Sequence, residues 1–377
     1  MSTKRVVIVG GGVIGLSLAF EMAQRGHDVA LLDQDRVGRQ ASWAGAGILA
    51  PANSATAVHP LDQLTGLSNE LHPAWSQRLM ELTGINNGYS NCGGVYIART
   101  VGDVATLAGS QLNWNDFEIE NSKLSANELA QRVPILQFEN SHSAIWVPGE
   151  SQICNPRHLK ALVAANEKLG VRIVESVHGL TVTADLDRSK NLSAGGESFA
   201  FDQVCFAAGV GTSGLLEQFG LRLPMIPVRG QMLLFKLPEM LWQPIINEGS
   251  RYIVPRRDGH VLVGSTTEEA GFDCRTTEDQ IADLQTFAEG LIPQLTEANR
   301  IKAWAGLRPA TFDGMPFIGR VSGCENVFVA TGHFKIGLQL STATAVTLAD
   351  QMEGKKPQVD LSPFAVARMD ENQSRGN

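Results

Sequence analysis

Short apolar runs alternate with glycine turns and amphipathic stretches from the first residues of the chain. Residues 6–9 form an apolar run, a glycine turn occupies 10–15, and apolar positions recur at helical spacing over 16–23. A second apolar run, 29–32, ends at Asp33. This pattern predicts a strand, a tight turn, a helix and a second strand, which is the order found in a dinucleotide-binding unit.

The same pattern returns twice further along the chain. Residues 204–206 read as another buried strand that ends close to Gly209. Residues 327–330 read as a third buried strand, and the break Gly332–Lys335 is followed by a helix from about Ile336. These segments predict a second contribution to the sheet and a helix start that faces a ligand.

Strand-like runs of another kind occupy the middle of the chain. Residues 94–98, 232–235 and 260–264 alternate or cluster apolar side chains as a mixed or antiparallel sheet does. They predict a second domain that covers a substrate.

Composition narrows the class of protein. The chain has 377 residues and 43 % hydrophobic content, enough for a large core in two or three lobes. A net charge of −8 without a basic block argues against nucleic acid as a partner, so positive charge for an anionic substrate must be concentrated locally. No apolar stretch is long enough for a membrane span or a signal segment. The five cysteines are scattered singly, which predicts no metal site and a cytoplasmic location.

The glycine turn carries the chemistry of nucleotide binding. Gly10, Gly12 and Gly15 match G-x-G-x-x-G, and Asp33 lies at the distance expected of a ribose-binding acid. The backbone N–H groups that open the helix would hold a pyrophosphate. A tight turn without a ligand is the alternative. The acid favours FAD or NAD over NADP.

A run of small side chains follows the second strand, at residues 39–51. Small residues let the backbone approach a flat ring or a phosphate closely, which favours FAD. A small-residue helix packed on the sheet is the alternative, and the run alone does not separate the two.

Residues 304–339 hold the candidate substrate-binding residues. Arg308 offers a planar fork of donors suited to a carboxylate, although an arginine here could also form a structural ion pair. By residue type alone, Tyr252 reads as a core aromatic whose hydroxyl bonds to the backbone, and His333 reads as a packing or backbone-contact histidine. Lys335 stands at the N-terminal end of the expected helix, the less favourable end for a cation, which hints at a local anion.

Five motifs together resemble the D-amino-acid-oxidase-like flavoprotein family, in particular its glycine oxidase branch in thiamine biosynthesis. They occur in the family's order between residue 5 and about residue 352. The motifs are GGGVIGLSLAFEMAQRGHDVALLD, ASWAGAGILAP, YIVPR at 252–256, AGLRPATFDGMPFIG and GHFKIGL.

The resemblance implies a set of residues that hold FAD. We include with them the glycines of the turn at 10–15 and those that follow the later strands. The expected FAD-binding residues are Gly10, Gly12, Val13, Ile14, Gly15, Asp33, Gln34, Ala41, Ser42, Ala46, Gly47, Ile48, Val177, Gly209, Gly332, His333, Phe334, Lys335, Ile336, Gly337, Leu338 and Gln339. For the substrate carboxylate it implies Tyr252, Arg308 and Lys335. The chain departs from the family pattern at Lys335, where relatives carry arginine, and at Ile336, where they carry asparagine. The charge is kept but the second bidentate fork is lost.

The implied activity is FAD-dependent oxidative deamination of glycine, a small amino acid or an N-methyl amino acid by hydride transfer. The products are an imine or oxo acid, ammonia and, with oxygen as acceptor, hydrogen peroxide. Residues 306–313 contain no cysteine and 39–51 no histidine, so non-covalent FAD is expected. A D-amino-acid or sarcosine dehydrogenase with another acceptor is the first alternative. A non-catalytic flavin-binding subunit is the second. A homo-oligomer is compatible with each of them.

The expected fold is therefore α/β, with two interleaved domains. A Rossmann-like FAD-binding domain of the glutathione-reductase type would comprise residues 1–85, 148–222 and 302–366. A mixed or antiparallel substrate domain would comprise 86–147 and 223–301, and 367–377 would form a polar tail.

Overall fold

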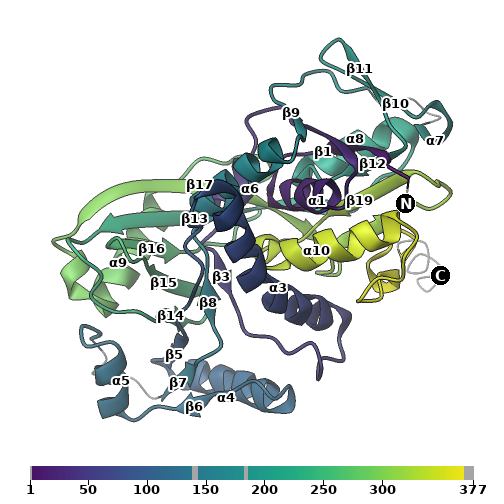
Figure 1. Ribbon diagram of the computed structural model, residues 1–377. Helices are drawn as coiled ribbons and strands as arrows, with labels where there is room; N and C mark the ends of the chain where they lie inside the picture. Colours follow the sequence, from purple (N-terminus) through teal and green to yellow (C-terminus); the bar gives the residue numbers. More distant parts are fainter. Residues whose placement is uncertain (1, 138–142, 182–185, 369–377) are drawn as a thin grey trace, which may run out of the picture.

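The computed structural model describes residues 2–137, 143–181 and 186–368, which form two main sheets side by side (Figure 1). The predicted tail falls largely on 369–377, outside the described residues. None of the helices within the described ranges combines the length and the apolar character needed to cross a membrane.

The six-stranded sheet contains the predicted dinucleotide-binding unit. Its parallel strands lie in the order β9 (Arg172–Val174), β2 (Asp28–Leu32), β1 (Arg5–Val9), β12 (Gln203–Phe206) and β19 (Val327–Thr331), and β18 (Phe317–Arg320) adds an antiparallel edge. β12 and β19 are buried along their whole length because both faces of the sheet are covered. That is why these strands read as continuous apolar runs.

Helices α1 (Val13–Gln24) and α10 (Gly337–Met352) pack on one face of this sheet, and α3 (Pro60–Thr83) and α6 (Asn155–Lys168) pack against these two helices and each other. A second apolar cluster covers the other face and includes the β10 (Asn191–Ala194) and β11 (Glu197–Ala200) hairpin. Short helices complete this half: α2 (Gln40–Ala44), α7 (Leu186–Ser189) and α8 (Thr212–Leu216), with 3₁₀ turns at Gly209–Gly211, Glu217–Phe219 and Ser362–Phe364.

The eight-stranded sheet is mixed, as predicted. Its order is β17 (Asn299–Thr311), β13 (Met225–Lys236), β16 (His260–Gly264), β15 (Arg251–Pro255), β14 (Ile245–Glu248), β5 (Gly94–Ala98), β7 (Ser143–Val147) and β6 (Ser122–Lys123). All neighbours are antiparallel except β14 and β5. The sheet is accompanied by α4 (Val101–Asp116), α5 (Ala126–Arg132), α9 (Glu278–Leu291) and a 3₁₀ turn at Pro293–Leu295. A three-stranded sheet of β3 (Ile48–Leu49), β8 (Ser151–Gln152) and β4 (Ser90–Asn91) completes the fold.

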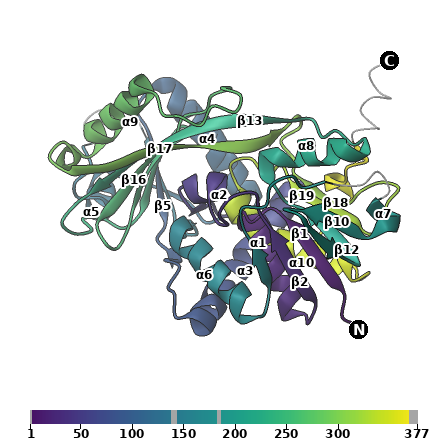
Figure 2. The ribbon, with the colours of Figure 1, turned by 90° about the horizontal axis from the view of Figure 1, so that it is seen from above.

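The long strands β13 and β17 join the two halves. They pair along almost their whole length and run from the α9 side of the larger sheet toward α8 beside the smaller one (Figure 2). The predicted domain boundary at residue 302 falls inside β17. The α/β fold class is confirmed, and the division into domains stays a prediction.

One buried carboxyl group in the larger half gives a pH-dependent stability. Glu150 has no exposed surface, and its two oxygens accept from Asn247 Nδ2 at 3.1 and 3.4 Å. Burial raises the pKa of Glu150 to about 7, although hydrogen bonds from Tyr96 and Asn247 oppose the rise. The neutral carboxyl is therefore the form that the folded protein prefers.

We expect Glu150→Gln to raise the melting temperature at pH 9 by a few degrees and to leave it nearly unchanged at pH 5. The native pKa lies above the ordinary value, so the stability that protonated Glu150 contributes is complete below about pH 4.5 and is lost as the pH rises through about 7. Thermal unfolding followed by circular dichroism at the two pH values measures the difference. The same shift at both pH values would contradict this account of Glu150.

Candidate active site

A cavity of about 930 Å³ lies where the two sheets meet. Its walls include the carboxyl ends of β1, β2 and β19 and residues of β13, β15 and β17. Ligands of open α/β sheets bind at this end of the strands, and the volume is near the upper end of the range of about 300–1,000 Å³ for cofactor sites.

Nearly all of the predicted binding residues border this one cavity. They are Gly10, Gly12, Val13, Ile14, Asp33, Gln34, Ala41, Ser42, Ala46, Gly47, Ile48, Val177, Gly209, Tyr252, Arg308, Gly332, His333, Phe334, Lys335, Gly337, Leu338 and Gln339. Gly15 and Ile336 do not border it. A Cβ on Gly15 would stand 1.9 Å from the carbonyl oxygen of Gly10, so Gly15 lets α1 pack against the turn. Ile336 is the N-cap residue of α10 and packs on the core of the smaller half.

Gly10 begins the glycine turn between β1 and α1. Its φ of +113° lies in the region that favours glycine, and a Cβ here would stand 2.5 Å from the backbone of Ala207. The chain turns tightly enough for α1 to begin at Val13, directly at the cavity. The first amides of a helix lack partners within the helix and carry partial positive charge, which suits a phosphate.

Asp33 lies at the end of β2, at the cavity wall. Its Oδ2 accepts from Gly11 N at 2.6 Å and its Oδ1 from Asp35 N at 2.8 Å. Burial raises the pKa of Asp33, while these two backbone donors oppose the rise. Each carboxylate oxygen can accept a further hydrogen bond, so Asp33 can still receive a ribose hydroxyl.

The small-residue segment lines the cavity rather than forming one long helix. Helix α2 ends at Ala44, and residues 45–48 follow the wall. Two side chains from the larger sheet hold the segment from behind: Trp304 Nε1 donates to Ala44 O at 3.0 Å and Arg256 donates to Ala46 O at 2.6 Å. Asn155 Nδ2 donates to Ser42 O at 2.8 Å and ties the start of α6 to this segment.

The segment before α10 joins the two halves of the cavity. Phe334 has a φ of +47°, in the left-handed region, and its N–H donates to Pro309 O at 3.0 Å. This bond places Lys335 beside the strand that carries Arg308. His333 is buried with Nε2 3.2 Å from Thr344 Oγ1, and burial lowers its pKa to about 3, so its ring stays neutral.

Arg308 is a cation of β17 that borders the cavity. Its guanidinium donates to Thr266 O at 2.9 Å and to Ser265 Oγ at 2.8 Å, and no carboxylate of the described residues lies within 4.0 Å of it. The structural ion pair that the sequence left open is therefore absent from the described part of the chain. Two of the five guanidinium donors are used by neutral acceptors, so three remain for a ligand.

Gly230 makes room for this guanidinium. On β13 it pairs with Gly306 and lies diagonally opposite Arg308. A Cβ on Gly230 would stand 2.0 Å from the Arg308 terminal nitrogen. Any side chain at 230 would displace the fork.

Two further predicted residues lie at the same wall. The Tyr252 hydroxyl donates to Met232 Sδ at 3.4 Å. Burial raises the pKa of Tyr252, although a hydrogen bond with Ser265 and the charge of Arg308 oppose the rise, so the phenol keeps its proton for donation. Lys335 is largely exposed, with its ammonium 5.2 Å from the centre of the Phe334 ring. Burial and then the charge of Arg308 lower the pKa of Lys335. Arg308 and Lys335 therefore both contribute positive potential to the same cavity.

Sequence reasoning missed several residues of the cavity wall. Gly230 and Ser265 contact the guanidinium of Arg308. Other parts of the cavity are bordered by Arg36, Arg39, Phe272 and Cys274. Gly230 lies in the segment GQM at 230–232 and Ser265 in the segment GSTT at 264–267, and neither segment is a motif with a known chemical role.

A family model described as FAD dependent oxidoreductase (DAO) matches residues 5–351. The chain belongs to this family. It is 35 % identical to glycine oxidase of Pseudomonas putida over 96 % of the chain and 98 % of that protein. It is 33 % identical to the bifunctional protein ThiO/ThiG of Trichormus variabilis over 99 % of the chain and 56 % of that protein. The crystal structure of glycine oxidase from Geobacillus kaustophilus superposes with a TM-score of 0.91 at 32 % identity, covering 97 % of this chain and 99 % of that one.

The cavity fits the cofactor of this family. The turn at Gly10, the start of α1 and Asp33 suit the dinucleotide, and the segment 45–48 with the start of α10 suits the flat ring. The protein is accordingly an FAD-dependent oxidoreductase, and the contacts of single residues with FAD stay predictions.

Proposed function

We propose that the protein is an amine oxidase that oxidises glycine, or a similarly small amino acid or N-methyl amino acid, with non-covalent FAD and oxygen. The observation that carries this proposal is Arg308, a largely buried guanidinium that borders the cofactor cavity without a carboxylate among the described residues. Burying such a charge is costly unless an anion pairs with it, and an amino-acid carboxylate is such an anion. The glycine oxidases of similar sequence support the same substrate class.

In this proposal, Arg308 and Tyr252 bind the two carboxylate oxygens. Bound FAD supplies the hydride acceptor, so the protein needs no nucleophile and no strong base. Its contribution is to hold the substrate Cα–H toward the flavin and to keep water from the carboxylate, since orientation can provide a large part of the rate.

The start of α10 and Lys335 add positive potential at the flavin end. Gly337 opens α10 at the cavity, and the amides of its first turn lack partners within the helix. This potential would favour the negative charge that a reduced flavin carries. Lys335 therefore has two roles in the proposal: a second cation for the substrate carboxylate and an electrostatic partner of the cofactor.

Anaerobic titration of the purified yellow protein tests the proposal. Glycine, sarcosine and D-alanine are added separately and the flavin absorbance is followed, and air is then admitted. Bleaching followed by rapid reoxidation and hydrogen peroxide release is the expected result. Bleaching without reoxidation by air would instead favour a dehydrogenase, and no bleaching by any of these amines would favour a non-catalytic flavin protein. Denaturation with acid should release all of the flavin; flavin that stays with the protein would point to a covalent bond, for which Cys274 at the cavity is the first candidate.

A place in thiamine biosynthesis is the finer part of the proposal. Support comes from the relatives named ThiO/ThiG, in which a chain like this one is fused to a second protein. Growth of a deletion strain of the source organism without thiamine tests it, with glycine oxidase activity in extracts measured in parallel. Growth at the wild-type rate would contradict the pathway assignment and leave the activity untouched.

We expect Lys335→Arg to lower the glycine KM by about three- to tenfold, because a second fork would replace a point charge and add roughly one hydrogen bond. Steady-state kinetics with glycine measure this effect. Lys302→Arg is the matched control, since Lys302 is an exposed lysine that lies over Trp43 and does not border the cavity. A KM unchanged by Lys335→Arg would show that Lys335 does not bind the substrate.

A further inference from the structure

The orientation of Arg308 depends on one segment of the chain. Both observed hydrogen bonds of its guanidinium go to residues that directly follow β16, Ser265 and Thr266. Arg308 reaches this segment across Gly230, from β17 over β13. A movement of residues 265–266 would therefore move the donors that remain for a carboxylate.

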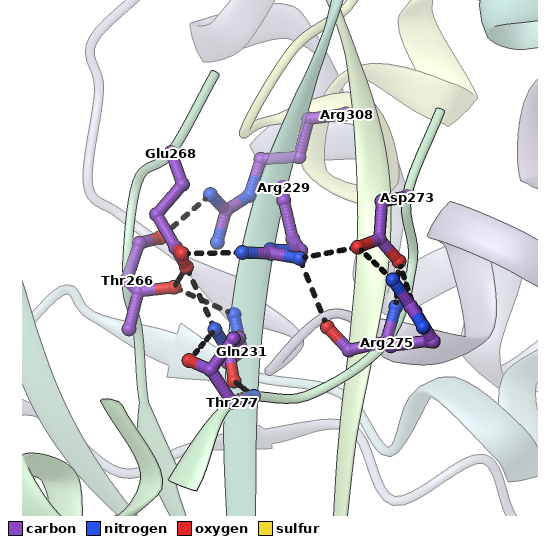
Figure 3. Close-up of polar contacts among 8 residues, drawn as sticks. All are labelled: Arg229, Gln231, Thr266, Glu268, Asp273, Arg275, Thr277 and Arg308. Atoms are coloured by element: carbon purple, nitrogen blue, oxygen red, sulfur yellow. Dashed lines mark hydrogen bonds and ion pairs between the residues drawn. The ribbon is translucent and has the colours of Figure 1, made fainter. Parts of the chain in front are cut away.

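An ion pair holds this segment against β13. Arg229 and Glu268 exchange both backbone hydrogen bonds, at 2.8 and 3.0 Å, and the Arg229 guanidinium donates to Glu268 Oε2 at 2.7 Å. Arg229 is only 7 % exposed. The pair extends the sheet by one rung beyond the end of β16, at the level of Arg308 (Figure 3).

Glu268 also holds Thr266 through its other oxygen. The Thr266 hydroxyl donates to Glu268 Oε1 at 2.6 Å and accepts from Gln231 N at 3.0 Å. Gln231 Nε2 donates to the same Oε1 at 2.9 Å. The Thr266 hydroxyl thus both donates and accepts a hydrogen bond. These two bonds hold Thr266, whose carbonyl oxygen accepts from Arg308.

The guanidinium of Arg229 also contacts the later part of the segment, at residues 273–275. Its second terminal nitrogen donates to Arg275 O at 3.2 Å and lies 3.4 Å from Asp273 Oδ2, while Thr277 N donates to Gln231 Oε1 at 2.8 Å (Figure 3). Arg229 therefore holds both limbs of the stretch 265–277 on the strand beside Arg308.

We propose that the Arg229–Glu268 ion pair is the positioning element of Arg308 and thereby sets the affinity of the site for carboxylates. Neither residue borders the cavity. The pair acts on Arg308 through Thr266, and the charges of Tyr252 and Glu268 also oppose the lowering of the Arg308 pKa by burial. A displacement of about 1 Å in a binding group can reduce activity by about a hundredfold, so the rigidity of this chain of contacts has a functional consequence. The inference rests on the proposed role of Arg308 in carboxylate binding.

Glu268→Gln is the sharpest variant. The new amide keeps the size of the side chain and can still accept from Thr266 and Gln231, but it loses the charge that faces Arg229. Arg229→Lys is the second variant, because it keeps the charge with fewer donors. Glu248→Gln is the matched control: Glu248 is a buried carboxylate of the same sheet, paired with Arg99 at 2.5 Å, and neither residue borders the cavity.

Acetate is the probe for carboxylate binding, followed by its effect on the flavin absorption spectrum, and glycine turnover is measured alongside. We expect Glu268→Gln to weaken acetate binding and to raise the glycine KM by between about tenfold and a hundredfold, with a smaller effect on kcat and with the flavin retained. Arg229→Lys should give an intermediate loss, and Glu248→Gln none.

A double-mutant cycle separates positioning from general stabilisation. If the pair acts through Arg308, Glu268→Gln should cause no further loss of glycine kcat/KM once Arg308 is alanine. Equal losses in both backgrounds would overturn the proposal. So would an unchanged acetate affinity in Glu268→Gln, or no acetate binding by the wild-type protein. If acetate binds but no amine bleaches the flavin, the proposed function fails while the cycle can still be completed with acetate.

Discussion

Replacing Arg308 with alanine should raise the glycine KM by between about thirtyfold and a thousandfold, because a charge-assisted bidentate contact contributes roughly 2–4 kcal/mol. The guanidinium has no carboxylate partner among the described residues, so its removal leaves no buried charge behind. FAD should remain bound, since the nucleotide end of the cavity is built from other segments. Steady-state kinetics and the flavin-to-protein absorbance ratio measure the two effects.

Two companion variants make this result specific to the position of the guanidinium. Arg300→Ala removes an exposed arginine of the same strand, which bonds to Gln285 away from the cavity, and should leave the KM unchanged. Gly230→Ala keeps Arg308 but fills its place, so it should also weaken glycine binding. A normal KM in Arg308→Ala would assign this residue a structural role.

Replacing Gly10 with alanine should give a protein purified largely without FAD. A Cβ at this position would stand 2.5 Å from backbone atoms of Ala207, and backbone cannot yield as a flexible side chain can. The φ of +113° adds strain for any residue with a side chain. The turn must open, and with it the start of α1 moves from the cavity. The flavin-to-protein ratio after purification and titration of the apoprotein with FAD measure the loss.

Gly26→Ala is the control for backbone strain alone. Gly26 also has a positive φ, +86°, but a Cβ at this position would have no atom within 4 Å, and the residue is outside the cavity. The substitution should lower the stability by about 1 kcal/mol and keep full flavin content. Full flavin content in Gly10→Ala would show that the turn tolerates a side chain and that its glycine is not required for the cofactor.

The part of the cavity that β1, α1 and β2 form was largely predictable because these elements are local in sequence. The strand expected at 6–9 is β1, Arg5–Val9, and the helix expected from about residue 336 begins at Gly337. An apolar run buried on both faces and a glycine at a turn leave marks at fixed spacings in the chain. Asp33 follows its strand for the same reason, and the structure places it at the cavity.

The environment of Arg308 could not be predicted from the sequence because segments that are far apart in the chain form it. Gly230, Ser265 and Arg308 lie on different strands or their ends, and only the register of β13 with β17 places the guanidinium over Gly230. Whether the Arg308 guanidinium forms an ion pair depends on which acceptors lie near it. That proximity is set by distances across the sheet, which the sequence does not give. The same holds for Arg229 and Glu268, which the sequence marked with no motif.

The sequence by itself determined the α/β class, the glycine turn before the first helix and the residue types available to a carboxylate, because these follow from local periodicity, backbone requirements and side-chain chemistry. Only the tertiary structure decided that Arg308 lacks a carboxylate among the described residues, that Lys335 shares its cavity, and that a buried ion pair holds the segment on which Arg308 rests. Those features arise from strand register and from packing between distant segments, which local patterns do not encode.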